Sequence, residues 1–328
     1  MPKRVTVVEV GPRDGFQMEN VFIPTDLKIE VIDTLAASGV SKIEATSFVS
    51  PKVIPQMADS LLVMRRVRRR PEVLYTALVP NMKGAQRAIE AGVDAMRVVV
   101  CASETYNQRN VGMTVADSLK NCQEIFAAGQ RSGVPVEAVI GLAFGCPLEG
   151  EILEDRLLDL TKTLAKMGYA EISIADTVGL ANPAEVRRRM ERIQQELPQV
   201  HSSLHLHNTR GLGLANVLAG LEAGTDTFDS SLGGLGGCPV VPGGSGNIST
   251  EDLVNMLEEM EIQTGIDIEQ IIAASCLMET FLMRQLPSYV LRSGTPVQLH
   301  RRMAAVAPSP GCTREASGVD HVTHPALR

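Results

Sequence analysis

Short runs of apolar, largely β-branched residues alternate along the chain with longer, helix-length segments, and this alternation repeats eight times. Within the first long segment, Leu27, Val31 and Leu35 recur at every fourth position, which is the spacing of one helix face. A regular alternation of strands and helices is typical of βαβ units and a parallel sheet. The predicted strands cover residues 5–10, 42–45, 73–79, 95–100, 136–144, 171–177, 202–208 and 227–232.

Glycines mark the predicted helix ends, because glycine adopts the left-handed conformation of a C-cap without a Cβ penalty. Asn182 followed by Pro183 marks a helix start. Eight strands with eight helices predict an α/β fold of the (β/α)8 TIM-barrel type. An open doubly wound sheet would usually have fewer strands, and no GxGxxG turn follows the first strand here. The glycines at the predicted helix ends are Gly39, Gly92, Gly133, Gly168 and Gly224.

Beyond the eighth strand, Ser249 opens a further predicted helix that runs to about Thr280, with acidic residues in its first turn. The barrel is therefore expected to carry extra C-terminal helices within one domain of residues 1–290. From about Leu299 onward, prolines and glycines interrupt every pattern. Residues 291–328 are expected to form a mobile C-terminal tail.

Composition narrows the class of protein. The chain has 328 residues and a net charge of −7, with no Trp and few other aromatic residues, which argues against nucleic-acid binding. The arginine-rich runs 65–70 and 187–189 fall on predicted helices and are interpreted as solvated faces. No stretch of 18 apolar residues predicts a membrane span, and the first apolar run is too short for a signal peptide. Six cysteines without a CxxC pair suit a reducing compartment, so we expect a cytoplasmic protein.

Barrel enzymes place their chemistry at the C-terminal ends of the strands, and two such ends carry candidate residues. Arg13 and Asp14 follow the first strand within a Gly-Pro turn. His205 and His207 on the seventh strand share one face, because side chains alternate along a strand. Two imidazoles and a carboxylate suit Mg²⁺, Mn²⁺ or Zn²⁺. The alternatives are a surface ion pair at residues 13 and 14 and two core histidines.

Further candidates follow other strands. A glycine-rich loop at residues 233–247 carries Cys238, and a cysteine in a mobile loop suggests reactivity, although such loops also cradle phosphates. Glu44 and Asp176 lie at predicted strand ends and are either structural partners of Arg and bound water or acid/base groups. Cys146, after the fifth strand, is interpreted as structural.

Taken in order, these segments resemble the 3-hydroxy-3-methylglutaryl-CoA (HMG-CoA) lyases, which belong to a superfamily of metal-dependent lyases and Claisen-condensing barrels. The resemblance spans about residues 4–290 and rests on six segments. They are Val8-Glu9-Val10-Gly11-Pro12-Arg13-Asp14-Gly15, residues 43–51, the Cys146 segment, Ala175-Asp176-Thr177, the His205/His207 strand, and residues 237–253 from Gly237-Cys238-Pro239 to Leu253.

The resemblance implies a role for each candidate residue. Asp14, His205 and His207 bind a divalent cation, Mg²⁺ or Mn²⁺, with Asn247 near or on it. Arg13 stabilises the enolate of the departing acetyl-CoA, and Cys238 is the acid/base group. Glu44 and Asp176 support the site and its waters. The implied reaction is cleavage of HMG-CoA, or a close 3-hydroxyacyl-CoA analogue, to acetyl-CoA and acetoacetate, as in leucine degradation. We expect an acyl-CoA substrate, no nucleic-acid or membrane partner, and a homodimer or higher homo-oligomer.

Departures from the family pattern define the alternatives. Asn208 and the Gly-Leu pair that follows Arg210 are closer to the isopropylmalate synthase branch, so a Claisen-condensing acyltransferase is the runner-up. The Gly-Cys-Pro loop belongs to the lyase branch, and the segment after residue 290 is too short for a regulatory domain of the condensing enzymes. A pyruvate-type aldolase without CoA is a third hypothesis. Arg210 stands where the family usually has Tyr. It either tunes the choice of acyl substituent, or it faces solvent or pairs with a neighbouring carboxylate.

Overall fold

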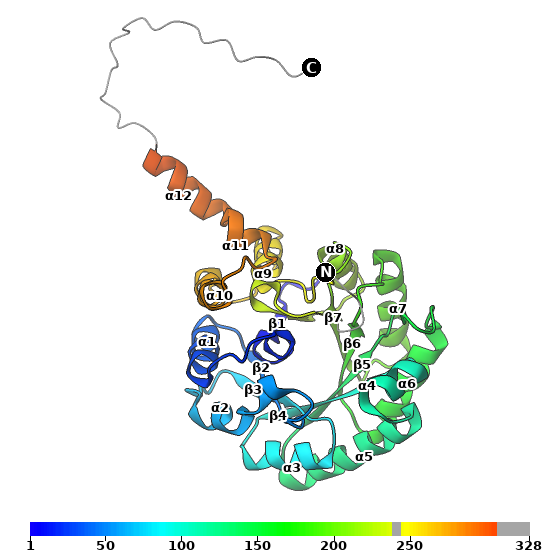
Figure 1. Cartoon of the computed structure of the whole chain (residues 1–328). Helices are drawn as coiled ribbons and strands as arrows, with labels where there is room; N and C mark the ends of the chain where they lie inside the picture. Colours follow the sequence, from blue (N-terminus) through cyan, green and yellow to red (C-terminus); the bar gives the residue numbers. More distant parts are fainter. Residues whose placement is uncertain (238–243, 307–328) are drawn as a thin grey trace, which may run out of the picture. The chain divides into compact units, whose positions relative to one another are not determined.

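Eight parallel strands close into a barrel in the order in which they occur along the chain (Figure 1). The computed structural model describes residues 1–237 and 244–306. The last strand pairs with the first in register from Thr6 with Thr227 to Glu9 with Ser230, which confirms the predicted (β/α)8 TIM barrel. The strands are β1 (Thr6–Glu9), β2 (Lys42–Ser47), β3 (Leu74–Leu78), β4 (Ala95–Cys101), β5 (Val136–Gly141), β6 (Glu171–Asp176), β7 (His201–Leu206) and β8 (Thr227–Ser230).

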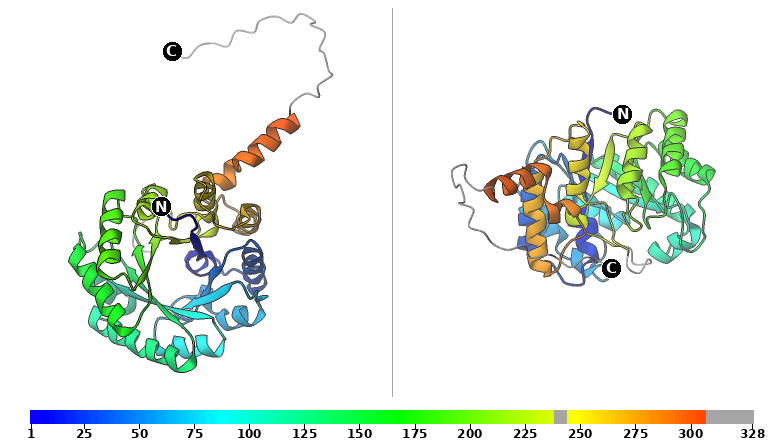
Figure 2. Two further views of the ribbon diagram at one scale, coloured as in Figure 1. Left: turned by 180° about the vertical axis from the view of Figure 1, so that it is seen from behind. Right: turned by 90° about the horizontal axis from the view of Figure 1, so that it is seen from above.

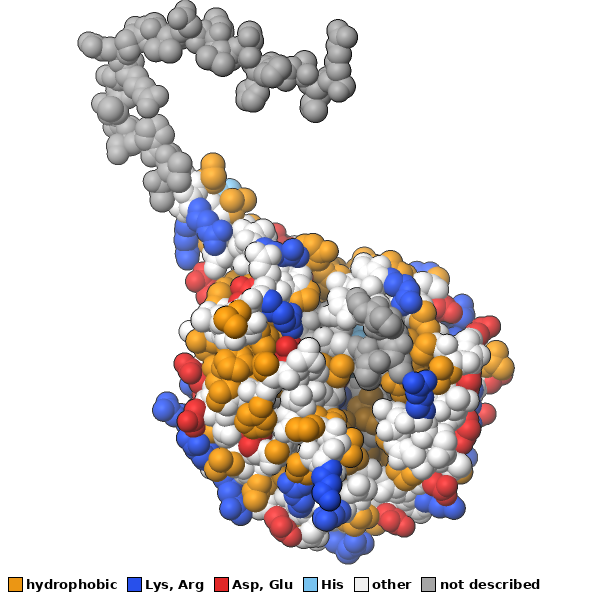
Figure 3. Space-filling view, in the orientation of Figure 1, with side chains coloured by type: hydrophobic (Ala, Val, Ile, Leu, Met, Phe, Trp, Pro, Cys, Tyr) orange, Lys and Arg blue, Asp and Glu red, His pale blue; other side chains and the backbone are white. Residues whose placement is uncertain are grey.

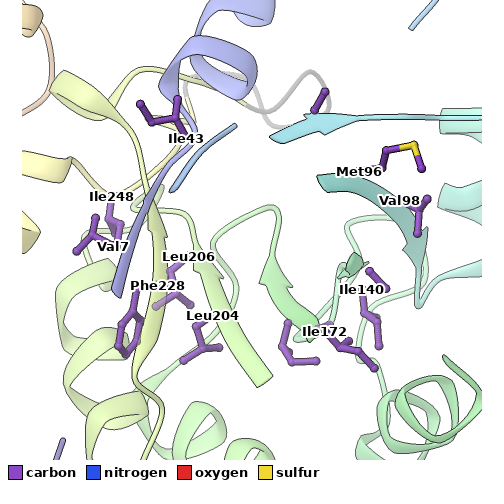
Figure 4. Close-up of a cluster of buried hydrophobic side chains, with 14 of the residues drawn as sticks. Val7, Ile43, Met96, Val98, Ile140, Ile172, Leu204, Leu206, Phe228 and Ile248 are labelled. Atoms are coloured by element: carbon purple, nitrogen blue, oxygen red, sulfur yellow. The ribbon is translucent and has the colours of Figure 1, made fainter. Parts of the chain in front are cut away.

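The barrel strands are apolar on one face and largely polar on the other. One face of each strand packs against the surrounding helices. The buried apolar side chains labelled in Figure 4 lie on these strands, apart from Ile248, which follows β8. The alternate positions carry charges that pair across the barrel. Lys42 on β2 lies 2.9 Å from Glu171 on β6, and Arg97 on β4 lies 3.0 Å from Asp229 on β8. Because neither pair joins neighbouring strands, these side chains meet in the barrel lumen.

Helices surround the strands, as two further views show (Figure 2). All five glycines predicted to end helices have positive φ, from 72° at Gly92 to 105° at Gly168. Asn182 accepts a hydrogen bond from the Glu185 backbone N–H and so caps the helix that begins at Pro183. The helices of the barrel are α1 (Thr25–Ala37), α2 (Ser60–Arg66), α3 (Met82–Glu90), α4 (Glu104–Val111), α5 (Val115–Ser132), α6 (Glu154–Met167), α7 (Pro183–Glu196) and α8 (Gly213–Glu222).

The predicted strand ends differ from those in the structure by at most two residues, and two predicted elements differ by more. The fifth strand stops at Gly141 rather than residue 144, because Leu142 adopts a positive φ of 56° and turns the chain. The long helix predicted from Ser249 is two helices, α9 (Thr250–Glu259) and α10 (Ile268–Leu282). Glu261 and Gly265 have positive φ between them, and Gln263 instead pairs with the chain before β1.

The chain divides into two units, Met1–Arg292 and Ser293–Arg328. Helix α11 (Tyr289–Ser293) reaches the boundary, and α12 (Pro296–Val306) belongs to the second unit. Helix α12 lies within the segment expected to be a tail. A helix can form there because the prolines and glycines that interrupt the pattern begin only at Pro308. Residues 307–328 of that predicted tail lie outside the described part of the chain.

Acidic and basic side chains are interspersed over the face of the barrel that Figure 3 shows. The arginine-rich runs are paired with acids, as in Arg188 with Glu154 at 2.8 Å and Arg69 with Asp94 at 2.9 Å. The exposed members of the runs agree with the interpretation as solvated helix faces. Arg189 contradicts it, because its side chain is buried and its guanidinium donates to the carbonyls of Ala143 and Ile152. Within residues 1–237 and 244–306, no helix has the length and apolar character needed to cross a membrane.

Candidate active site and metal centre

A tight turn after β1 carries Arg13 and Asp14 to the mouth of the barrel. Residues Gly11–Gly15 form a π-helical turn, in which the N–H groups of Arg13 and Asp14 both donate to the Val10 carbonyl. Glycine at position 11 allows a close approach, because a Cβ there would lie 2.1 Å from the Leu232 side chain and would displace it. The turn after β1 is thereby pressed against the turn after β8.

The Arg13 guanidinium lies between two carboxylates. Its Nη1 is 2.5 Å from Asp14 Oδ1, and its Nε and Nη2 are 2.7 and 2.6 Å from Glu44 Oε2. Burial opposes the charged form, but Glu44 and Asp14 outweigh burial and raise the pKa of Arg13 above its usual value. Arg13 is therefore a fixed cation whose orientation is set by Glu44, a residue inside β2 rather than at its end.

The two histidines at the end of β7 face each other and Asp14. His205 Nε2 lies 3.2 Å from His207 Nε2 and 3.9 Å from Asp14 Oδ2. One ligand atom from each of the three residues falls within 4.8 Å of the others. Burial, followed by the neighbouring His205, lowers the pKa of His207 to about 3. Burial would raise the pKa of Asp14, but Arg13 and the two histidines bring it to about 2. Neutral His207 and ionised Asp14 are the forms that bind metals.

Asn247 is brought beside the histidines by backbone pairing. The Asn208 N–H donates to the Gly246 carbonyl at 2.8 Å, and the Ile248 N–H donates to the Leu206 carbonyl at 3.1 Å. Asn247 Nδ2 donates to Asp14 Oδ2 at 2.8 Å, while Asn247 Oδ1 is buried without a partner. Two facing imidazole nitrogens, a carboxylate and an unpartnered amide oxygen form a donor set that suits a divalent cation.

Asp176 and Cys238, the remaining predicted site residues, are not part of this set of contacts in the described residues. Asp176 accepts the backbone N–H groups of Leu180 and Ala181 at 2.8 and 3.0 Å and so holds the turn after β6. Burial raises its pKa to about 6. In the described residues, Asp176 forms no hydrogen bond or ion pair with Arg13, Asp14 or the two histidines. Cys238 lies outside the residues that the structure describes.

Two side chains near the mouth have structural contacts. Cys146 is buried, and its Sγ accepts the N–H groups of Leu148 and Glu149 at 3.3 and 3.4 Å, in line with its structural interpretation. Arg210 Nη1 donates to the carbonyls of Val178 and Gly179 at 3.0 and 2.9 Å. Arg210 is exposed, as the solvent-facing alternative predicts, and it also ties the turn after β7 to the turn after β6.

Sequence reasoning missed Arg97 and Asp229, which lie beneath the site. Asp229 Oδ2 is 3.1 Å from His205 Nδ1, and the Arg97 guanidinium donates to both oxygens of Asp229 at 3.0 and 3.3 Å. The available signal was a charge within an apolar strand run, Ala95-Met96-Arg97-Val98-Val99-Val100. Such a residue is rarely fully buried without a partner.

Two buried glutamates, also missed, hold the turns that flank the site. Glu9 accepts the N–H groups of Gly11 and Leu232 at 2.7 and 3.0 Å, and Glu251 accepts the Gly233 N–H at 2.9 Å. Burial raises the pKa of Glu9 to about 7 and that of Glu251 to about 8. The turns after β1 and β8 are thus held by carboxyl groups rather than by apolar packing alone.

The matching family model and the similar proteins point to the same family. The HMGL-like family model matches residues 4–278. The chain is 42% identical over 287 residues to hydroxymethylglutaryl-CoA lyase YngG of Bacillus subtilis, which covers 88% of this chain and 96% of that protein. It is also 42% identical over 274 residues to the cytoplasmic 3-hydroxy-3-methylglutaryl-CoA lyase of Mus musculus, covering 84% of this chain and 80% of the relative.

Solved structures extend the likeness to three dimensions. An HMG-CoA lyase from Acinetobacter baumannii, in complex with coenzyme A and 3-methylmalate, has a TM-score of 0.87 and 44% identity, covering 91% of this chain and 97% of that chain. The carboxyl transferase domain of Rhizobium etli pyruvate carboxylase shares the fold, with a TM-score of 0.67 at 20% identity.

Proposed function

The chain belongs to the HMGL-like family, and from this premise we propose that it is a carbon–carbon lyase that cleaves HMG-CoA to acetyl-CoA and acetoacetate with a divalent cation. The observation that carries the proposal is the convergence of Arg13 with Asp14, His205, His207 and Asn247 at one end of the barrel. This set pairs a fixed cation with ligands that suit a metal. The high identity to lyases favours cleavage over the condensing alternative.

Asp14, His205, His207 and Asn247 are the residues that would hold Mg²⁺ or Mn²⁺. When bound, the ion would act as a Lewis acid and make the C3 hydroxyl of the substrate more acidic. Three or four protein ligands leave positions for oxygen atoms of the substrate. The donor set is largely buried, which strengthens its electrostatic interactions relative to those in water.

The reaction itself is a retro-Claisen cleavage. A base removes the proton of the C3 hydroxyl, the C3–O bond becomes a carbonyl, and the C2–C3 electron pair moves to the thioester as an enolate. Arg13 stabilises the negative charge that develops on the thioester oxygen, and Glu44 keeps the guanidinium in place before that charge appears. Cys238 then protonates C2, which completes acetyl-CoA.

The setting of the enzyme follows from the same features. Cys101, Cys122, Cys146 and Cys276 are all free thiols in the described residues, in keeping with a cytoplasmic protein. The structure of the Acinetobacter baumannii relative with coenzyme A supports an acyl-CoA substrate. We expect a homodimer or higher homo-oligomer.

The direct test is an assay of the full chain with Mg²⁺ or Mn²⁺ against a panel of 3-hydroxyacyl-CoAs, with the products identified by mass. We expect acetyl-CoA and acetoacetate from HMG-CoA and no turnover in EDTA. A parallel arm supplies acetyl-CoA and 2-oxoacids. Condensation there, without cleavage in the first arm, would favour the isopropylmalate synthase type instead.

A further inference from the structure

Arg97 is a buried cation in the barrel lumen, directly below the site. Only 2% of its surface is exposed. Its guanidinium donates to both oxygens of Asp229, and its Nη1 also lies 3.8 Å from Glu44 Oε2. Glu137 approaches Arg97 Nε from below at 3.5 Å. A bidentate Arg–carboxylate pair fixes both orientation and distance, so the Asp229 carboxylate has a defined position.

Asp229 and Glu44, the two carboxylates that lie between Arg97 and the site, each contact a different side chain of the site. Asp229 Oδ2 lies 3.1 Å from His205 Nδ1. Glu44 Oε2 accepts hydrogen bonds from Arg13. The carboxylate that contacts His205 and the carboxylate that contacts Arg13 therefore both lie beside the Arg97 guanidinium. Arg97 itself forms no hydrogen bond with His205 or Arg13 in the described residues.

The contact between Asp229 and His205 determines which nitrogen is available as a ligand. An ionised carboxylate only accepts hydrogen bonds, so the Nδ1 of a neutral His205 must carry the proton and donate it to Asp229. The lone pair then lies on Nε2, which faces His207 and Asp14. Ligand histidines in metal sites are commonly held in this way by a carboxylate.

We propose that Asp229 and Arg97 are positioning residues, with Asp229 fixing His205 in the Nδ1–H tautomer and Arg97 fixing Asp229 and Glu44 together. The inference rests on the proposed function in taking His205 as a ligand of a divalent cation. It adds that the affinity for the cation and the placement of Arg13 share one support in the lumen.

The central experiment replaces Asp229 with Asn in the full chain and measures two properties. The first is the tautomer of His205 in the metal-free protein, from long-range ¹⁵N–¹H correlations assigned against His205→Gln. The second is Mn²⁺ affinity by EPR. We expect wild type to be Nδ1–H and Asp229→Asn to lose this preference and bind Mn²⁺ about 10–100-fold more weakly.

Glu137→Gln is the matched control, because Glu137 also lies against Arg97 but contacts neither His205 nor Glu44 in the described residues. It should keep the tautomer and bind Mn²⁺ within about twofold of wild type, because it leaves the two-pronged contact between Arg97 and Asp229 in place. An Asp229→Asn protein that keeps both the Nδ1–H tautomer and wild-type Mn²⁺ affinity would overturn the inference.

Arg97→Lys provides the second variant and covers the case in which Asp229→Asn does not fold. It retains a cation beside Asp229 but loses the two-pronged contact. We expect weaker Mn²⁺ binding and a lower kcat with a smaller change in KM, because His205 and Arg13 are both displaced. Unchanged Mn²⁺ affinity and kcat would contradict the role of Arg97. A wild-type protein that binds no Mn²⁺ would defeat the proposed function, whereas the tautomer measurement would still test Asp229.

Discussion

The Arg13 side chain is buried, charged and held in one orientation. Its guanidinium would be costly to bury alone, and it is retained because Asp14 and Glu44 pair with it from two sides. Glu44 accepts through one oxygen only, and its Oε1 has no hydrogen-bond partner in the described residues. The orientation of Arg13 is therefore set by the protein before any substrate arrives, which is the condition for electrostatic stabilisation of a transition state.

Replacing Arg13 with Gln should lower kcat by about 10³-fold, the scale of losing a main transition-state donor. KM should change much less, because the negative charge that Arg13 meets appears only in the transition state. Steady-state kinetics with HMG-CoA provide the measurement. If kcat stays at the wild-type value while KM rises, Arg13 only anchors the substrate.

His201 and His207, which lie at opposite ends of β7, allow a matched pair of variants. His207→Ala removes a side chain of the metal set and should abolish high-affinity Mn²⁺ binding by EPR, while the circular dichroism spectrum remains that of the wild type. His201→Ala is the control, because His201 begins the same strand but is half-exposed and contacts Asp226. Normal Mn²⁺ binding by His207→Ala would refute the ligand assignment.

At the scale of elements, the turns after β1 and β8 depend on buried carboxyl groups. Glu251 is fully buried and accepts from the Gly233 N–H and the Ser275 hydroxyl. Burial favours its neutral form and raises its pKa from 4.5 to about 8, and Glu9 is shifted in the same direction. The fold therefore prefers both groups protonated, and it must take up a buried negative charge as pH rises.

Stability should consequently decline with rising pH. A group whose pKa is raised by folding contributes its stabilisation fully below its unfolded pKa of about 4.5 and loses it as pH rises through about 8. The unfolding midpoint of wild type should fall mainly between pH 4.5 and about 8, by about 2–4 °C for each kcal/mol lost. Glu251→Gln, which stays neutral, should show a shallower decline in calorimetry. Equal slopes for the two proteins would refute this assignment.

The elements were predictable where a local signal exists. Gly133 and Gly168 ended helices as predicted, because a left-handed C-cap is a property of one residue. The end of β5 was missed, because Leu142 takes up a positive φ that its own side chain does not favour. Arg97 and Asp229 were missed for a different reason: 132 residues separate them in sequence, and only closure of the barrel brings them together.

On the scale of the whole molecule, the barrel strands use one face for the apolar core and the other for the charged side chains of the lumen. Apolar side chains between strands and helices form the core, whereas the lumen holds a series of paired charges from Lys42 to Asp14. Sequence patterns predicted the apolar layer and the fold directly. They predicted the site only in part, since Arg13, Asp14 and the two histidines are recognisable as a motif, while their supports lie on other strands.

Because the apolar layer carries the fold, the barrel should remain folded without a metal and gain stability when one binds. A ligand that binds only the folded state adds about 2.7 kcal/mol at a concentration 100 times its Kd. For a domain of this size, that gain corresponds to a rise in the unfolding midpoint of about 5–10 °C.

Differential scanning calorimetry in EDTA and across a Mn²⁺ titration measures this shift. Wild type and His201→Ala should both unfold cooperatively in EDTA and rise together with Mn²⁺, whereas His207→Ala should keep the EDTA midpoint at every concentration. An equal rise in His207→Ala would place the stabilising ion elsewhere on the molecule. Loss of the cooperative transition in EDTA would mean that the metal, and not the apolar layer, holds the barrel together.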